Sequence, residues 1–172
     1  VRSSAASDVY KRQVYDSLME SVDRKAWLEY IISLFGDAKI ERVADCACGT
    51  GALSIPLAKR GYKVTGLDAS EEMLRIAAEN ARAERVNVPF VCQDMRRLAL
   101  HRPADAVLAV CDGVNYLTLK GAESFFANAY AALREGGMLL FDISSRYKLS
   151  TILGNNTFCL LYTSDAADDL TR

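Results

Sequence analysis

A glycine-containing turn decides the fold of this chain, and it reads Asp45-Cys46-Ala47-Cys48-Gly49-Thr50-Gly51. The apolar segment 42–46 comes before it and predicts a strand, and the segment from about residue 52 to 60 predicts a helix. Glycine lets the backbone turn tightly and approach a ligand, and the peptide N–H groups that open the next helix attract negative charge. The turn therefore indicates a binding site between a strand and a helix.

An acid closes the next predicted strand. Residues 62–67 form that strand and Asp68 ends it, with sixteen residues between Gly51 and Asp68. A carboxylate at this place can accept hydrogen bonds from two ribose hydroxyls. Strand, glycine turn, helix, strand and acid in this order are more specific than the glycines alone. The alternative is an ordinary turn with a solvated Asp68.

The rest of the chain alternates helices and strands. Helices are predicted over residues 14–35, 70–85 and 121–134, the first ended by Gly36 and the last broken by Gly136-Gly137. Ser70 is a candidate cap for the middle helix. Further strands are predicted over 88–92, 104–111 and 138–143, and the second of these is apolar almost throughout, as in a strand covered on both faces. The alternation predicts an α/β fold, with a parallel sheet and helices on both faces.

Two stretches carry a resemblance to a known family. Residues 43–74, with the glycine turn and the run from Gly66 to Leu74, resemble motifs I and II of class I S-adenosylmethionine-dependent methyltransferases. The lead around Tyr15 and the strand end Phe141-Asp142-Ile143-Ser144-Ser145 resemble an uncharacterised bacterial group of small methyltransferases. The resemblance covers residues 14–158. It implies a Rossmann-like, mostly parallel sheet that two further strands complete after the fifth, and it departs from the family at Ala47, where the motif has glycine.

The resemblance also implies the cofactor, S-adenosylmethionine, and the residues that hold it. Asp45, Ala47 and the backbone from Gly49 to Gly51 would face its methionine part, and Asp68 its ribose. Asp94 would bind the adenine amine, or be a simple loop residue. The other implied neighbours are Met73, Met95 on the adenine ring, Cys111 at the mouth of the site, and a lid of Tyr15 and Trp27, of which Trp27 is equally well explained as core.

The acceptor side is less defined. Asp112, Asn115 and Tyr116 follow the predicted strand 104–111 and are candidates for orienting a methyl acceptor, although a purely structural turn explains them nearly as well. A sulfonium donor is already activated, so the enzyme has to align the acceptor and exclude water. A general base is needed only if the acceptor carries a proton. The expected activity is methyl transfer to a small-molecule acceptor.

Two other readings remain open. One is a non-catalytic module that binds S-adenosylmethionine, because the binding residues are clearer than the acceptor residues. The other is a nicotinamide-dependent oxidoreductase, which needs a third glycine where this chain has Leu53 and Ser54. Cys46 and Cys48 have no second close cysteine pair, so a zinc site is not expected.

Composition limits the function classes. The chain has 172 residues and a formal net charge of -1, without the basic cluster that a nucleic-acid-binding protein needs. It has no apolar run of about 18 residues, so no membrane span is expected. Its five cysteines are an odd number at irregular spacing, which favours reduced thiols and a cytoplasmic location.

Both ends resemble translated adapter DNA. A DNA sequence that encodes Ser7–Gln13 encodes Cys159–Asp165 when its reverse complement is read in another frame. We therefore expect a methyltransferase domain over residues 14–158, flanked by adapter-derived tails at 1–13 and 159–172 and continuing, in the natural protein, beyond Phe158. Without its last strands, the sheet would have an open edge at residues 138–143, which favours association with other chains.

Overall fold

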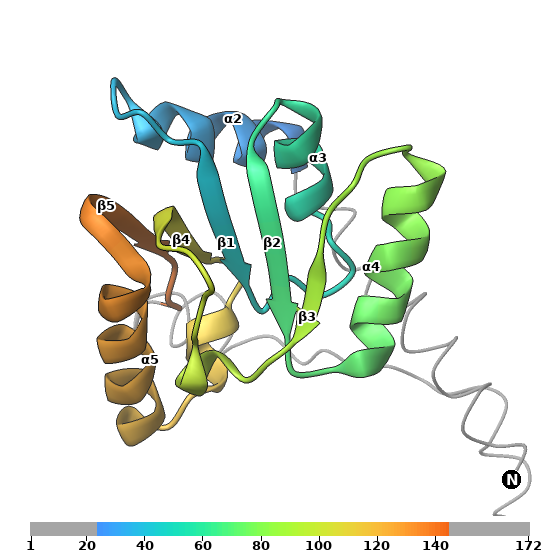
Figure 1. Ribbon diagram of the computed structural model, residues 1–172. Coiled ribbons are helices and arrows are strands. Elements are labelled where there is room, and N and C mark those ends of the chain that lie inside the picture. The colour runs from blue at the N-terminus through green and yellow to red at the C-terminus, as the bar shows by residue number, and fades with distance from the viewer. Residues whose placement is uncertain (1–23, 145–172) are drawn as a thin grey trace, which may run out of the picture. The chain divides into compact units, whose positions relative to one another are not determined.

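The computed structural model describes residues 24–144. Within them, five strands form one sheet in the order β3-β2-β1-β4-β5, and every neighbouring pair is parallel (Figure 1). The strands are β1 (Arg42–Cys46), β2 (Lys63–Asp68), β3 (Phe90–Cys92), β4 (Ala104–Ala109) and β5 (Leu133–Phe141). The predicted parallel sheet is confirmed. Both expected tails, Tyr15 and the segment 145–158 lie outside the described residues.

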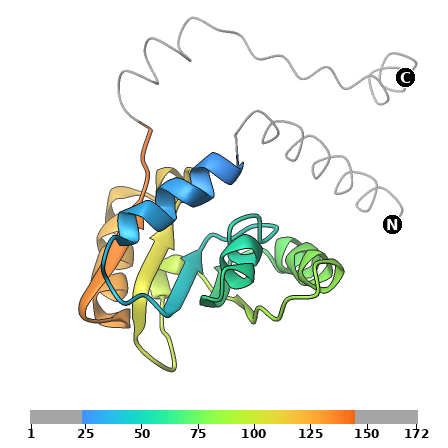
Figure 2. The same cartoon turned by 90° about the horizontal axis from the view of Figure 1, so that it is seen from above.

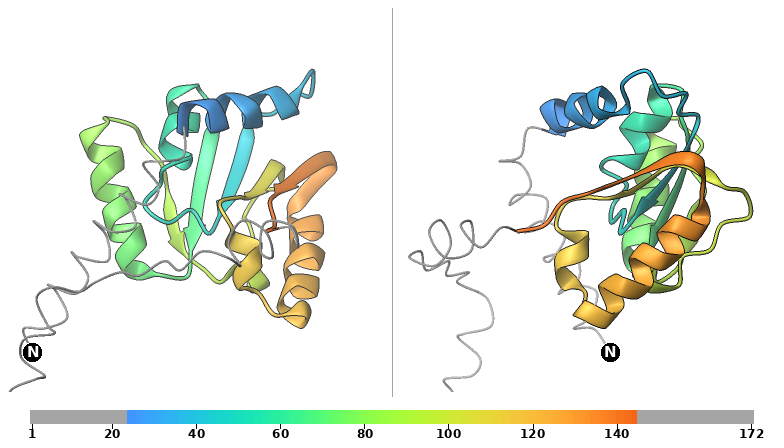
Figure 3. Two further views of the ribbon diagram at one scale, coloured as in Figure 1. Left: turned by 180° about the vertical axis from the view of Figure 1, so that it is seen from behind. Right: turned by 90° about the vertical axis from the view of Figure 1, so that its left-hand side faces the viewer.

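Helices cover both faces of this sheet. They are α2 (Arg24–Phe35), α3 (Ser54–Lys59), α4 (Glu71–Ala83) and α5 (Leu119–Ala132), with short 3-10 turns η1 (Met95–Arg97) and η2 (Gly113–Tyr116). The sheet lies between α5 on one face and α2, α3 and α4 on the other (Figures 2 and 3). Parallel strands joined by right-handed crossovers produce this arrangement when the strand order reverses beside β1. None of the helices in the described part is long and apolar enough to cross a bilayer.

Two apolar cores result, one on each face. On the α2 side, Leu28 and Ile31 pack against Val43 and Leu108, while on the α5 side Phe125 packs against Ala44 and other small strand residues. All six residues of β4 are buried, as a strand covered on both faces requires. The carboxyl ends of β1, β2 and β4 therefore stand on a rigid support.

Local signals in the sequence place several boundaries. β1 has the predicted bounds, Gly36 follows α2 with a φ of +52°, and the Ser70 hydroxyl accepts the Met73 N–H at 3.3 Å as the N-cap of α4. Helix α3 begins later than predicted, at Ser54, because two successive turns follow Gly49. These caps and turns fix the register of the elements that carry the site.

The end of α5 differs from the prediction. A helix to residue 134 and a strand over 138–143 were expected, but α5 ends at Ala132 and β5 begins at Leu133. The reason is that Leu133 already pairs with Ala104, and after a register shift Met138 pairs with Ala106. Gly136, at a φ of +70°, absorbs the extra residues inside the strand.

Candidate functional site

A cradle of backbone lies at the carboxyl ends of β1 and β2. Ala47, Gly49 and Gly51 all have positive φ angles, of 57°, 53° and 77°. The Cys48 N–H donates to the Leu67 carbonyl at 3.0 Å, so the turn is tied to β2. These left-handed residues curl the chain back on itself, which leaves a concave backbone surface above the sheet.

Asp68 is the polar centre of the cradle. Its half-buried carboxylate accepts the Gly49 N–H at 2.8 Å through Oδ2 and the Ser70 N–H at 2.9 Å through Oδ1. An ionised carboxylate offers about four acceptor positions, so these two bonds leave it able to take two hydroxyl donors. Asp68 thus orders the turn and can bind a ligand at the same time.

The glycines show where the cradle has room. A Cβ on Gly49 would meet nothing within 4 Å, whereas a Cβ on Gly51 would come within 3.1–3.3 Å of Ile55, Phe90 and Ala77. Gly51 is therefore glycine because protein packs around it, and Gly49 because of its φ angle and the open space above it.

Asp45 lies beneath the turn. It is 2% exposed, and its Oδ2 accepts the Ser54 hydroxyl at 2.5 Å. Burial raises the pKa of Asp45 to about 6, the Ser54 hydrogen bond opposes that rise, and the charge of Asp68 adds to it. Asp45 therefore fixes the turn to the start of α3 from below.

A second strained segment follows β4. Cys111 and Asp112 have φ angles of 60° and 66°, and with Ala47 they are three of the four non-glycine residues with positive φ in the described part of the chain. The Asp112 N–H donates to both carboxylate oxygens of Asp142, at 3.2 Å each. Backbone strain of this kind persists only where its surroundings enforce it, and it gathers at functional sites.

The two strained segments touch. A Cβ on Gly113 would lie 3.2 Å from the Ala47 Cβ, so the turn after β1 and the turn after β4 lie side by side. Cys111 belongs to the turn after β4, and partial burial and the charges of Asp142 and Asp45 raise the pKa of its thiol. The residues expected on the cofactor side and those expected on the acceptor side thus lie in adjoining turns.

Trp27 stands over the same edge from the start of α2. Its half-buried ring stacks on that of Tyr30, with centroids 5.6 Å apart. The indole lowers the pKa of the Cys111 thiol slightly, yet its buried N–H makes no hydrogen bond of normal length within residues 24–144. Trp27 therefore takes part in the packing of α2 and lies beside Cys111.

The carboxylate that was expected to bind the adenine amine, that of Asp94, already has a partner in the protein. The Asp94 carboxylate caps η1 through the Arg96 N–H at 2.9 Å and pairs with the Arg96 guanidinium, which lowers its pKa. Met95 is buried in the core on the α5 side, and Met73 lies half-buried in the first turn of α4. An adenine amine would therefore share Asp94 with Arg96.

The three acceptor candidates lie close together in and beside η2. The Asn115 side-chain amide donates to Asp112 Oδ1 at 2.6 Å, and the Tyr116 side chain is 86% exposed. The hydrogen bond between Asp112 and Asn115 is consistent both with a purely structural turn and with a pair of side chains positioned to bind an acceptor. Between residues 24 and 144, no cluster of three His, Cys, Asp or Glu side chains could hold a metal ion.

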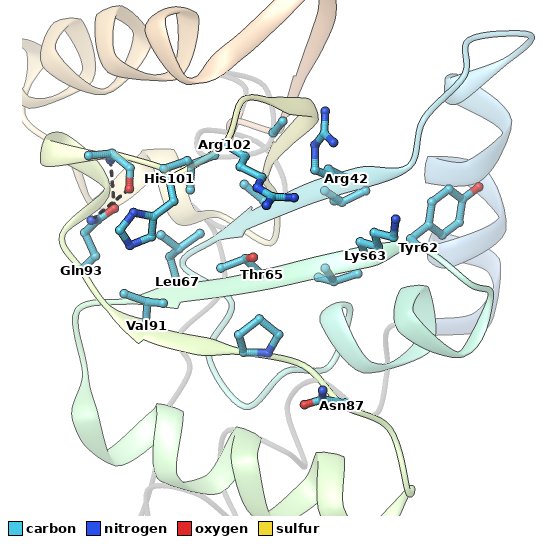
Figure 4. Close-up of a pocket in the computed structure, with 17 residues that line it drawn as sticks. Arg42, Tyr62, Lys63, Thr65, Leu67, Asn87, Val91, Gln93, His101 and Arg102 are labelled. Atoms are coloured by element: carbon cyan, nitrogen blue, oxygen red, sulfur yellow. Dashed lines mark hydrogen bonds between the residues drawn. The ribbon is translucent and has the colours of Figure 1, made fainter.

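A separate groove lies on another part of the sheet. It has a volume of about 560 Å³ and crosses the middle of β1, β2 and β3 on the α5 face, where only η1 and a loop connect β3 to β4 (Figure 4). Arg42, Lys63, His101 and Arg102 stand around it (Figure 4). None of the predicted site residues lines it. The groove is therefore separate from the cradle.

Two residues of the site were not among the predicted ones. Asp142 directly follows β5 and holds the turn after β4, and Ser54 anchors Asp45. The signal for Asp142 was present in the sequence, since an acid that ends a parallel strand is the feature that identified Asp68. Ser54 gave no such signal, because a hydroxyl at the start of a helix is common.

A parallel sheet of order 3-2-1-4-5, with a glycine cradle at β1 and an acid at the end of β2, defines a nucleotide-cofactor-binding α/β protein. A model of the methyltransferase domain family matches residues 43–137, more than half of the chain. The chain belongs to this methyltransferase family.

Individual relatives agree. A putative methyltransferase of Geobacillus sp. is 38% identical over 84% of this chain and 60% of its own length, and rat glycine N-methyltransferase is 33% identical over 96% and 61%. The crystal structure of an S-adenosylmethionine-dependent methyltransferase from Clostridium acetobutylicum superposes with a TM-score of 0.78, at 33% identity, over 87% of this chain and 62% of that one. The chain thus spans about 60% of the length of the curated relatives it matches.

Proposed function

We propose that the full-length protein transfers the methyl group of S-adenosylmethionine to a small-molecule acceptor, and that residues 24–144 contain its donor-binding half. The observation that carries this proposal is the pairing of Asp68 with Gly49. Their 2.8 Å hydrogen bond holds a carboxylate with spare acceptor capacity beside open space above a glycine turn. The family of the chain supplies the chemistry that such a cradle would serve.

Each part of the cradle has a task in binding. Asp68 accepts the two ribose hydroxyls, and the backbone from Gly49 to Gly51 faces the methionine part. Asp94 receives the adenine amine, with Arg96 keeping that carboxylate ionised. Cys111 and Trp27 close the site on the acceptor side.

S-adenosylmethionine supplies a methyl group on a positively charged sulfur and is already reactive. The protein then has to hold the acceptor atom in line with the carbon–sulfur bond and keep water away. Rigid turns at the ends of β1 and β4 are suited to this task because the strands beneath them are buried.

The test is isothermal titration of the full-length protein with S-adenosylhomocysteine. We expect Gly49→Val to abolish binding, because a branched side chain would fill the space above the turn. Gly36→Val is the matched control, since Gly36 has almost the same φ, of 52°, and equally open surroundings, but lies at the end of α2. It should carry a similar backbone strain and retain affinity.

Two results would change the proposal. Equal binding by folded Gly49→Val and wild-type protein would place the ligand elsewhere. Donor binding without methylated product, across a broad panel of small acceptors, would instead favour a non-catalytic cofactor-binding protein.

A further inference from the structure

A cavity of about 280 Å³ lies between α2 and the carboxyl ends of β4 and β5. Its walls are apolar or aromatic and include Trp27, Tyr30, Leu34 and Phe141. Asp142 is the one charged side chain among the described residues that line it. A mostly apolar cavity with a few polar groups is the usual form of a binding site for a small molecule.

The Asp142 carboxylate is only partly used. It receives one donor, the Asp112 N–H, which is shared between both oxygens at 3.2 Å, a long distance for such a bond. No other hydrogen bond or ion pair engages it within residues 24–144. A half-buried carboxylate in this state attracts a further donor, and a cation most strongly.

The cavity adjoins the donor cradle. Val110, which lines the cavity, is followed directly by Cys111, whose thiol senses the charges of both Asp142 and Asp45. On the other side of Cys111, the turn that contains Gly113 touches Ala47. Residues 111–113 therefore connect the cavity to the turn that we assign to the methionine part of the donor.

We propose that this cavity binds the methyl acceptor, and that the acceptor is a small amine held as its ammonium ion by Asp142 and the rings of Trp27 and Tyr30. Aromatic faces and a carboxylate together favour a cation over a neutral alcohol or an anion. This inference rests on the proposed function, because it assigns the second substrate of the same reaction.

The proton balance suits an amine. An ammonium ion has no lone pair, so it must first lose one proton, and the second lone pairs of the Asp142 oxygens can accept it. The nitrogen lone pair then forms the new N–C bond as the methyl–sulfur bond breaks, and the electrons of that bond remain on sulfur. The product leaves as a methylated ammonium ion, and Asp142 releases its proton to water.

The experiment compares matched acceptors on the full-length protein. Formation of S-adenosylhomocysteine is measured with a series of small primary amines and with the alcohols and carboxylic acids of the same carbon skeletons. We expect turnover with amines and at least about 30-fold lower kcat/KM with the matched alcohols, which carry no positive charge and so form no ion pair with Asp142.

Two variants test the cavity itself. Asp142→Asn should lower kcat/KM for the best amine by about 30-fold, and Leu34→Trp, which fills the cavity without removing a polar contact, by at least about tenfold. Both should bind S-adenosylhomocysteine within about threefold of the wild type. Asp37→Asn, an exposed acid between α2 and β1, is the control and should behave as the wild type.

The outcomes separate the two proposals. A wild-type protein that binds no S-adenosylhomocysteine contradicts the proposed function. A protein that binds it but methylates alcohols or acids in preference to amines contradicts only the amine assignment. If Asp142→Asn loses S-adenosylhomocysteine and Leu34→Trp has normal kinetics, the carboxylate serves the donor or the turn after β4, and the assignment of the cavity is wrong.

Discussion

The Asp68 carboxylate accepts the Gly49 N–H at 2.8 Å, and this bond joins the end of β2 to the turn after β1. The other oxygen accepts the Ser70 N–H at the start of α4, so a single side chain fixes two loops. Asp68 therefore orders the backbone at the place where we propose that the ribose binds. A ligand that adds hydroxyl donors to this carboxylate binds a site that is already arranged.

We expect Asp68→Ala to weaken S-adenosylhomocysteine binding by about 1–3 kcal/mol, because hydrogen bonds to a charged group are lost. Isothermal titration measures the loss. Glu71→Ala, which removes an exposed acid from the first turn of α4, is the control and should leave affinity unchanged. Unaltered affinity in a folded Asp68→Ala protein would remove the ribose assignment.

Ala47→Gly should stabilise the protein by roughly 0.5–1 kcal/mol. Ala47 has a φ of 57°, which costs a residue with a side chain about 1–2 kcal/mol. Glycine removes this strain, while the freedom it adds to the unfolded chain costs about 0.4–1 kcal/mol. The midpoint of urea unfolding measures the difference.

Ala127→Gly is the control for that experiment. Ala127 is exposed within α5, so glycine there should cost about 1 kcal/mol. Opposite signs for the two substitutions are expected. Equal destabilisation would mean that Ala47 is not strained in solution.

Ala47 shows which features of the site can be predicted from the sequence and which cannot. The glycine turn, β1 and the acid after β2 could be predicted because short signals, a glycine pair and a periodic apolar run, determine them locally. In the sequence, Ala47 is distinguished only as the alanine that stands where the family motif has glycine. Its left-handed backbone could not be predicted, because Cys48 bonded to Leu67 and the contact with the turn at Gly113 impose it from outside the segment.

The contacts around Asp142 could not be predicted from the sequence. Asp142 and Asp112 are 30 residues apart, and only the pairing of β5 with β4 brings them together. The start of β5 was also missed, because Leu133 continues a helical pattern and becomes a strand residue through its pairing with Ala104. Contacts between distant segments carry no local signal, so these parts required the three-dimensional structure.

Asp45→Asn should stabilise the protein at pH 7.5 by up to about 3 kcal/mol. Burial, against the opposing Ser54 bond, raises the pKa of Asp45 to about 6 in the folded protein, above its value in the unfolded chain near 4. The neutral Asp45 carboxyl therefore contributes fully to the stability of the fold below pH 4, and this contribution is lost as the pH rises through 6. Asparagine stays neutral and still accepts the Ser54 hydroxyl.

Urea unfolding of the wild type and of Asp45→Asn at a series of pH values from 4 to 7.5 checks this. The difference between the two free energies of unfolding should grow with pH, and the exposed Asp37→Asn serves as the control for removal of one negative charge. A difference that stays constant over this range would show that Asp45 ionises normally within the fold.

Asp105→Asn should have the opposite pH dependence. Asp105 is 5% exposed at the start of β4; its Oδ2 accepts the N–H groups of Glu41 and Arg42 at 3.0 and 2.7 Å, and its Oδ1 accepts Arg134 Nε at 2.5 Å. Burial alone would raise the pKa of Asp105, but the Arg42, Arg134 and Glu41 donors outweigh it and lower the pKa to about 2.

The ionised carboxylate therefore stabilises the fold fully above about pH 4, and this contribution is lost as the pH falls through 2. At pH 7 we expect Asp105→Asn to cost about 2–3 kcal/mol, since an amide cannot receive all three donors. Urea unfolding at pH 7 and in acid measures the cost, which should shrink as the pH falls toward 2.

The hydrogen bond between Arg134 and Asp105 also explains the shifted register of β5, because Arg134 lies in the extra residues between Leu133 and Met138 and is held there by Asp105. Arg134→Leu should therefore destabilise the protein too. In either variant, a loss of stability that does not change with pH would mean that packing of the irregular strand, and not the charge pair, holds β5 in place.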